Sequence, residues 1–238
     1  MKTIDVALLP NIVNHQLATG SVALVIDVLR ASSTILTAVS NGAKQVIPVI
    51  EPEEAKEMAK RFPAGEVLLC GEREGNKIPG FDLGNSPLEF TQETVAGKTL
   101  IMSTTNGTKA CHSAQNAGSV YIGCFLNLTA VSDAAKQTNE NILIITSGKE
   151  GRFSLEDTVC AGALVEKLNA EKGYTITDSA RVAQILYTIY RSNLRQMFAT
   201  CEHGVYLASL GYTQDLDYCA QLDSYKLVPK FTSGIITI

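Results

Sequence analysis

The sequence predicts an α/β fold of three layers, α/β/α, with a largely parallel or mixed sheet and extra helices toward the C-terminus. Short apolar runs that are continuous rather than alternating are typical of strands buried on both faces. These runs alternate with helical stretches at least five times, which favours right-handed crossover connections. The 238 residues, 45% of them hydrophobic, suffice for one core, so we treat residues 1–238 as one domain with a helical subregion from about residue 170.

The predicted elements follow one another in a regular order. The predicted strands are residues 22–26, 46–50, 67–69, 100–102, 120–122 and 142–145. The helices between them are residues 31–41, 52–61, 110–117 and 128–137. Gly42 and Gly118 suit the ends of two helices, and Pro52 suits the first turn of another. The later part of the chain predicts helices at 154–168, 179–192 and 203–210, then strands at 226–231 and 235–238.

Composition and charge exclude several classes of protein. The net charge is −4, so no basic excess is present to bind a nucleic-acid backbone. No apolar run approaches the roughly 20 residues of a membrane helix, and Asp5 and Pro10 interrupt the apolar N-terminal patch. The six cysteines are scattered without a CxxC pair, which favours a reduced, cytoplasmic protein. We therefore expect no nucleic-acid partner, no membrane and a cytoplasmic location.

The first candidate site follows the strand at residues 22–26. Asp27 ends this strand, Arg30 comes next, and the hydroxyls of Ser32 and Ser33 open a helix. A helix N-terminus attracts anions, and an arginine fork binds phosphate or sulfonate with two hydrogen bonds. The alternative is structural: Ser32 is an N-cap, and Asp27 and Arg30 form an ion pair.

The second candidate site repeats this form after the strand at residues 100–102. Ser103, Thr104, Thr105 and Asn106 supply polar side chains, and Gly107 lets a ligand approach the backbone closely. The turn departs from a Walker phosphate-binding loop, because that motif requires glycine where methionine precedes Ser103. A helix cap at Thr105 is the alternative interpretation.

The third candidate site is a long loop, residues 71–87. Glu72 and Asp82 are candidate ligands of a hard cation such as Mg²⁺, which prefers carboxylate, water and substrate oxygens. Residues 86–89 have the pattern of a capping box with proline at the first helical position. That pattern favours a structural role for its serine and for Asn85.

The fourth candidate site lies at residues 148–157. Lys149 and Arg152 place positive charge near the end of a predicted strand. Asp157 stands in the first turn of the next helix, where it is either a cation ligand or, with Ser154, part of a helix cap.

The sequence lacks the residues that several known catalytic mechanisms require. A dehalogenase-type aspartyl nucleophile needs a second aspartate two residues after Asp27, where Leu29 stands. No GxSxG elbow, GxGxxG loop or metal-type histidine spacing is present, so we expect packing or surface roles for His15, His112 and His203. The carboxylates, cations and hydroxyl-rich helix starts that remain suit a metal-assisted reaction on a small, multiply anionic substrate.

These segments resemble those of the 2-phosphosulfolactate phosphatase family, known from coenzyme M biosynthesis. The resemblance spans about residues 20 to 235, and its motifs lie at residues 27–34, 71–73, 80–87, 103–108, 148–151 and 156–157, with His203-Gly204 and Cys219-Ala220 late in the chain. It implies a Mg²⁺-dependent phosphomonoesterase that converts (R)-2-phospho-3-sulfolactate to sulfolactate and phosphate. The three anionic groups of that substrate match the several anion sites that the residues suggest.

We therefore predict the following roles. The metal ligands are Asp27, Glu72 and Asp157, with Asp82 a weaker candidate. The substrate ligands are Arg30, Ser32, Ser33, Ser103, Thr104, Thr105, Asn106 and Lys149. Asp27 and Arg30 are catalytic, and Asp27 is the base for direct attack by water, because no covalent nucleophile is apparent. A phosphatase for another phosphorylated hydroxy acid and a non-catalytic binder of such a metabolite are the alternatives, and the resemblance suggests a homodimer.

Overall fold

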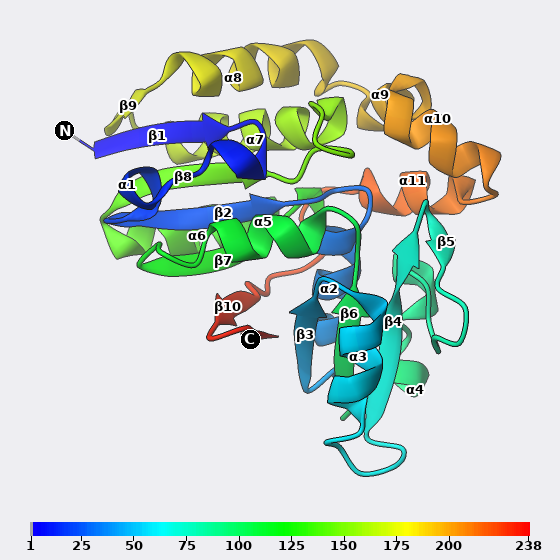
Figure 1. Cartoon of the computed structure of the whole chain (residues 1–238). Helices are drawn as coiled ribbons and strands as arrows, with labels where there is room; N and C mark the ends of the chain where they lie inside the picture. Colours follow the sequence, from blue (N-terminus) through cyan, green and yellow to red (C-terminus); the bar gives the residue numbers. More distant parts are fainter. Residues whose placement is uncertain (1) are drawn as a thin grey trace.

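The computed structural model describes residues 2–238, and its strands form one mixed sheet in the order β5-β4-β6-β3-β11-β10-β7-β2-β8-β1-β9 (Figure 1). The strands are β1 (Lys2–Ala7), β2 (Ser21–Ile26), β3 (Gln45–Val49), β4 (Val67–Arg73), β5 (Asn76–Lys77), β6 (Thr99–Ser103), β7 (Ser119–Gly123), β8 (Asn141–Thr146), β9 (Tyr174–Ile176), β10 (Lys230–Thr232) and β11 (Ile235–Thr237). The α/β class and the mixed sheet are as predicted.

The helices lie mainly between the strands and after β9. They are α1 (His15–Ala18), α2 (Ala31–Ser40), α3 (Pro52–Ala59), α4 (Gln92–Val95), α5 (Gly107–Ser113), α6 (Leu128–Thr138), α7 (Leu155–Leu168), α8 (Asp178–Tyr190), α9 (Leu194–Thr200), α10 (Glu202–Ser209) and α11 (Thr213–Cys219). Short 3-10 turns are η1 (Pro10–Ile12), η2 (Pro87–Glu89) and η3 (Phe125–Asn127). The extra helices after residue 170 were expected.

Both faces of the sheet are buried, as continuous apolar strands require. Along β2, Val22, Leu24 and Ile26 belong to one core cluster, which includes residues of α6, α7 and α8. The alternate residues Ala23 and Val25 belong to a second cluster with residues of α2 and α5. Side chains alternate between the two faces of a strand, so each face of β2 packs against its own apolar layer and neither face meets solvent.

The C-terminal hairpin joins two parallel halves of the sheet. β10 pairs antiparallel with β7, and β11 pairs antiparallel with β3 through Ile236 and Val46. Because β10 and β11 are themselves antiparallel, the half β4-β6-β3 runs opposite to the half that contains β7, β2 and β8. Figure 1 shows the two halves crossing at a steep angle, so the ends of β2 and β8 approach those of β4 and β6.

The predicted loop at residues 71–87 is wrong in part. β4 continues to Arg73 and turns back into β5, so the first residues of this segment are a hairpin. The predicted capping box at residues 86–89 is also wrong. Here η2 is a single 3-10 turn, and the Ser86 hydroxyl donates to Asp215 and does not cap η2. Strands β1 and β9 lie in segments for which no strand was predicted; the former pairs with β8, which is remote in sequence.

The helices after residue 170 pack on the outer face of the half of the sheet that contains β2 and β8. Helix α8 lies against α7 so closely that a Cβ at Gly162 would stand 2.0 Å from the Ala183 carbonyl oxygen. Helices α9, α10 and α11 then lead toward β4 and β5 (Figure 1). Within residues 2–238, no helix is both long enough and apolar enough to cross a membrane.

Candidate active site

A cavity of about 320 Å³ opens where the loops after several strands meet helix α10. Asp27 follows β2, Glu72 lies near the end of β4, Thr105 follows β6 and Lys149 follows β8. The lining consists of Asp27, Leu29, Arg30, Glu72, Arg73, Glu74, Gly75, Asn85, Thr105, Asn106, Lys149, Glu150, His203, Tyr206 and Leu207. Open α/β sheets bind ligands at this position, outside the carboxyl ends of their strands.

Asp27 is buried in the wall of this cavity, with 6% of its surface exposed. Its Oδ1 accepts a hydrogen bond of 3.2 Å from the Ala31 backbone N–H at the start of α2. Burial raises the pKa of Asp27 to about 6, while nearby His203 opposes the rise and the charge of Glu72 adds to it. A carboxylate whose pKa lies near neutrality is suited to accept a proton during catalysis.

Both carboxylate oxygens of Glu72 are held by backbone N–H groups. Oε1 accepts from Thr105 at 2.9 Å, and Oε2 accepts from Gly75 at 2.8 Å. These bonds tie the β4–β5 hairpin to the turn after β6. Glu72 therefore has a fixed orientation at the cavity wall, and each oxygen keeps a further lone pair for a ligand.

Arg30 does not pair with Asp27, which corrects the structural alternative for this motif. Its Nη1 lies 2.7 Å from Asp215 Oδ2 on α11, and its Nη2 donates to the Gly75 carbonyl at 2.9 Å. The guanidinium also stacks on the Tyr212 ring, 4.0 Å from its centroid. A buried arginine held on several sides presents its remaining N–H groups in a fixed direction.

Asp157 lies outside the cavity lining, although it is close enough to Asp27 for the charge of Asp27 to raise its pKa. Its Oδ1 accepts from the Val28 backbone N–H at 2.8 Å, and its Oδ2 accepts from the Ser147 hydroxyl at 2.9 Å. Burial raises the pKa of Asp157 well above its usual value, and the charges of Asp27 and Glu156 add to the rise. Its observed contacts fix the loops after β2 and β8, and its role as a metal ligand stays a prediction.

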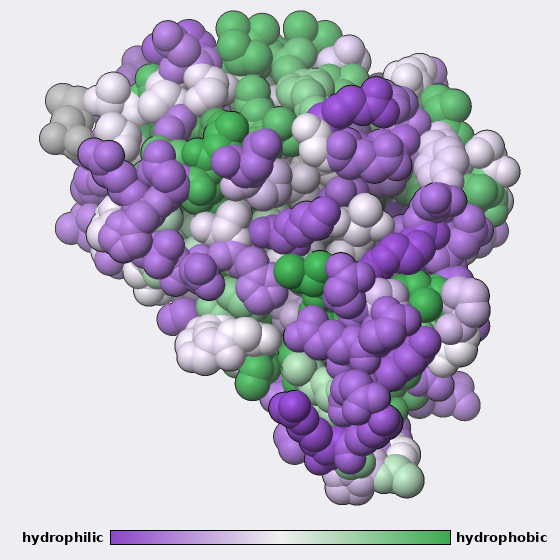
Figure 2. Space-filling model, in the orientation of Figure 1, coloured by the Kyte–Doolittle hydropathy of each residue, from purple (hydrophilic) through white to green (hydrophobic). Residues whose placement is uncertain are grey.

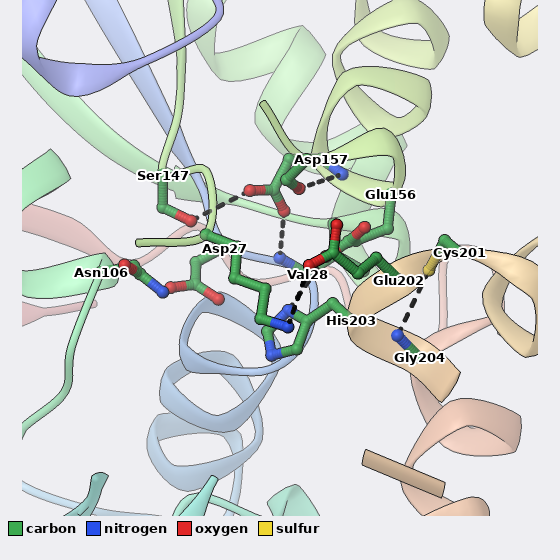
Figure 3. A network of polar contacts seen from close by, with 12 residues as sticks. Asp27, Val28, Asn106, Ser147, Glu156, Asp157, Cys201, Glu202, His203 and Gly204 are labelled. Atoms are coloured by element: carbon green, nitrogen blue, oxygen red, sulfur yellow. Dashed lines mark hydrogen bonds and ion pairs between the residues drawn. The ribbon is translucent and has the colours of Figure 1, made fainter. Parts of the chain in front are cut away.

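His203 lines the cavity, although the sequence suggested packing or surface roles for all three histidines. Its Nδ1 lies 3.0 Å from Glu156 Oε1, as Figure 3 shows. Burial raises the pKa of Glu156, but the hydrogen bond and charge of His203 outweigh this effect and lower it. The glutamate and histidine are 47 residues apart, so no local spacing could have indicated the pair.

Lys149 supplies positive charge to the cavity lining. Its Nζ lies 3.7 Å from a Glu202 carboxylate oxygen and 4.7 Å from the centroid of the Tyr206 ring. Arg152 also pairs with Glu202, at 3.1 Å, but it does not line the cavity. Lys149 is the less exposed of these two cations, with 16% of its side chain accessible against 66% for Arg152.

Most of the predicted hydroxyl ligands are engaged with protein groups instead of facing the cavity. The Ser33 hydroxyl donates to the Val28 carbonyl, and the Ser32 hydroxyl accepts from the Asp27 backbone N–H. In the second turn, the Ser103 hydroxyl donates to the Ile50 carbonyl. Thr104 Oγ1 accepts from the Thr108 backbone N–H at 3.3 Å. These four residues shape the two turns, and their contact with a substrate stays a prediction.

Two buried polar atoms at the cavity have no hydrogen-bond partner within the described chain. They are Thr105 Oγ1, on a predicted site residue, and Asn85 Oδ1, on a residue for which a structural role was expected. Buried polar atoms are rarely left unpaired in native proteins, so each such atom indicates a missing ligand or water. Asn106 lines the cavity too, and its side-chain oxygen accepts from the Glu150 backbone N–H at 3.2 Å.

The donor set at the cavity fits Mg²⁺. Across residues 2–238, no three His, Cys, Asp or Glu side chains converge into a preformed metal cage. Mg²⁺ does not need one, because it usually binds one or two carboxylates together with waters and substrate phosphate oxygens. Asp27 and Glu72 supply two carboxylates, and the unpaired Asn85 Oδ1 supplies a third hard oxygen. Asp82 is exposed, lies outside the lining and accepts from the Leu69 backbone N–H.

Comparison with known proteins identifies similar chains. The family profile described as 2-phosphosulpholactate phosphatase matches residues 7–234. A probable 2-phosphosulfolactate phosphatase of Caldanaerobacter subterraneus is 45% identical over 213 residues, 90% of this chain and 88% of the relative. The protein with the same description from Symbiobacterium thermophilum is 42% identical over 92% of this chain and 94% of its own length. One from Clostridium acetobutylicum is 38% identical over 98% of this chain and 99% of its own length.

Proposed function

Because the chain belongs to the 2-phosphosulfolactate phosphatase family, a family of phosphoric monoester hydrolases, we propose that its cavity hydrolyses 2-phosphosulfolactate to sulfolactate and phosphate. The observation that carries the proposal is the cavity itself, which is lined by Arg30 and Lys149 together with the buried carboxylate of Asp27. Family membership speaks against a non-catalytic binder. A phosphatase for another phosphorylated hydroxy acid is the second candidate, because the cavity recognises negative charge rather than one carbon skeleton.

The substrate carries a phosphate, a sulfonate and a carboxylate, and the cavity offers separate partners for anionic oxygens. The N–H groups of Arg30 that remain free can bind two oxygens side by side, and Lys149 binds as a point charge. Thr105 lines the same cavity, and its unpaired hydroxyl adds a neutral donor. Since the net charge of the chain is −4, this local field rather than the overall charge attracts the substrate.

A divalent cation completes the proposal. Asp27, Glu72 and the side-chain oxygen of Asn85 would hold Mg²⁺, with Asp157 behind them as a predicted further ligand. When bound, Mg²⁺ would neutralise charge on the phosphate oxygens and orient the phosphoryl group. The protein's own contribution is to bind the anionic groups and to remove a proton from the attacking water. Asp27 is suited to that proton transfer, because its carboxylate lines the cavity and, in the protein without a cation, burial raises its pKa above the usual value.

Glu72→Gln is expected to weaken metal dependence selectively. The amide keeps the shape of the carboxylate but removes one negative charge, so half-maximal phosphate release should need at least about 10-fold more Mg²⁺. Titration of Mg²⁺ into chelator-treated enzyme measures this value. Asp82→Asn is the matched control and should leave the titration unchanged, because Asp82 lies outside the cavity. Full activity of the wild type in excess chelator would contradict the metal proposal.

A phosphate-release assay tests the function directly. The wild type is incubated with a panel of phosphorylated hydroxy acids, with and without Mg²⁺. We expect a stereospecific preference for (R)-2-phospho-3-sulfolactate over phosphorylated hydroxy acids that lack a sulfonate. An equal or greater rate on an ester without the sulfonate favours the second candidate. Rapid-quench detection of a phosphorylated enzyme would contradict direct attack by water.

Three wider expectations belong to the proposal: a place in coenzyme M biosynthesis, a cytoplasmic location and a homodimer. For the last, α8 exposes Val182, Ile185 and Ile189, and Figure 2 shows hydrophobic side chains gathered over this helix at the top of the molecule. Exposed apolar stripes of this kind favour protein–protein contact. Light scattering by the purified protein reports its mass, and a monomeric mass would contradict the dimer.

A further inference from the structure

The environment of His203 suggests a defined chemical role. The residue lies in the first turn of α10, and its Nδ1 is bound to Glu156 Oε1 at 3.0 Å. Glu156 is 2% exposed, in the first turn of α7. Since the ring lines the cavity while Nδ1 is occupied, Nε2 is the nitrogen left for a ligand. Figure 3 shows the imidazole between Glu156 and the side on which Asp27 lies.

A carboxylate on one nitrogen of a histidine fixes the tautomer and the orientation of the ring. It also stabilises the protonated ring, whose other nitrogen then carries a proton that it can donate. Histidine is the side chain that most often donates or accepts protons in enzymes, and such catalysis contributes about 10²–10⁴-fold to a rate. The cavity therefore contains two proton-transfer groups, Asp27 and His203, within one space of about 320 Å³.

We propose that His203, oriented by Glu156, is the general acid that protonates the oxygen leaving phosphorus. This inference rests on the proposed phosphatase function and assigns the second of its two proton transfers. The leaving oxygen belongs to a secondary alcohol, which is a poor leaving group as an alkoxide. A proton delivered as the bond breaks removes the need to form that anion.

Two protons move as one phosphorus–oxygen bond forms and another breaks. The water oxygen forms a bond to phosphorus and passes one proton to the carboxylate of Asp27. The bond from phosphorus to the ester oxygen breaks, and its electron pair stays on that oxygen, which takes the proton from His203 Nε2. The products are the free hydroxy acid and inorganic phosphate. Asp27 is left protonated and His203 neutral, and transfer of one proton between them through solvent restores both.

The pair of Glu156 and His203 could instead serve only to hold α10 on α7. Esters with different leaving groups distinguish these two roles. A nitrophenolate departs without protonation, so loss of a general acid hardly affects its ester. An alkyl ester depends on that acid, so its hydrolysis should slow strongly. Damage to the fold would slow both esters to the same degree.

His203→Gln is tested on 2-phosphosulfolactate and on p-nitrophenyl phosphate. We expect kcat to fall about 100-fold or more on the first ester and less than about 5-fold on the second. His112→Gln is the matched control, since His112 lies outside the cavity, and it should leave both rates unchanged. Equal losses on the two esters, or no loss on either, overturn the assignment. A wild type that releases phosphate from neither ester overturns the proposed function, and the proton-donor role with it.

Glu156 acts through His203 and is a positioning residue. Glu156→Gln should lower kcat on the alkyl ester about 10-fold and leave its KM and the rate on the aryl ester within about 2-fold. Glu156→Asp, which keeps the charge, should recover part of this loss. A structural role alone would instead lower the rates on both esters together, and that result contradicts positioning.

Discussion

Asp27→Asn is expected to abolish phosphate release and to make the folded protein more stable. Asparagine has the same shape, and its side-chain oxygen can still accept from the Ala31 backbone N–H. It cannot take a proton from water, and it is a weaker ligand for a cation. We expect the rate to fall by at least about 10³-fold, because one residue loses both functions.

The gain in stability follows from the burial of Asp27. Burial raises the pKa of the folded state from 3.8 to about 6, so the ionised carboxylate opposes folding. This cost is absent below about pH 4, grows between pH 4 and pH 6 and is complete above pH 6. Since one pKa unit corresponds to about 1.4 kcal/mol, asparagine should raise the free energy of unfolding by about 2–3 kcal/mol at pH 7.5.

Thermal unfolding at two pH values measures this effect. At pH 7.5 and without Mg²⁺, the Tm of Asp27→Asn should exceed that of the wild type by about 5 °C or more. At the acidic end, near pH 4, the two values should converge. Asp133→Asn on the exposed surface of α6 is the control and should change neither Tm nor activity. A variant with wild-type turnover would contradict the catalytic role, and a lower Tm at pH 7.5 would contradict the burial cost.

Asp215→Ala is expected to have the largest destabilising effect. Asp215 and the Arg30 side chain are 2% and 1% exposed, and their ion pair is 2.7 Å long. Removal of one partner leaves a buried, uncompensated guanidinium and also deprives the Ser86 hydroxyl of its acceptor. Such changes destabilise by about 3–5 kcal/mol, which corresponds to a fall in Tm of about 10 °C.

A matched variant and a double variant separate stability from activity. Asp217 lies on the same helix, 60% exposed, and pairs with Arg195 at the surface, so Asp217→Ala should change stability by less than about 1 kcal/mol. The double variant Arg30→Met, Asp215→Leu replaces the buried pair by apolar side chains and should recover most of the stability. It should remain inactive, because Arg30 is proposed to bind the substrate. Recovery of activity in the double variant would contradict that role.

Much of the order of elements could be predicted because most of the buried strands are continuous apolar runs in the sequence. The runs at residues 22–26 and 142–145 are continuously apolar, and they form β2 and β8, covered on both faces. Strand β1 was not predicted because Asp5 interrupts its short apolar run, and its place depends on pairing with β8. Pairing between distant segments leaves no periodicity in either segment alone.

The candidate site could be predicted only in part. The strand-end motifs indicated six residues that line one cavity, although their roles stay predictions: Asp27, Arg30, Glu72, Thr105, Asn106 and Lys149. The partners that orient Arg30 and His203 were not indicated, because they come from remote segments. The carboxylate that holds Arg30 is 185 residues away in α11, and the glutamate beside His203 is 47 residues away.

The amino-acid sequence alone determined most of the strands and helices, and which strand ends carry polar chemistry, because propensity and hydrophobic period act over a few residues. The tertiary structure decided that two oppositely directed half-sheets meet at a steep angle and bring those ends together. It also decided which side chains face the cavity and which are held by backbone groups. The meeting of the half-sheets and the orientation of these side chains depend on long-range strand pairing and packing. Buried polar atoms then form hydrogen bonds with partners that are far away along the chain.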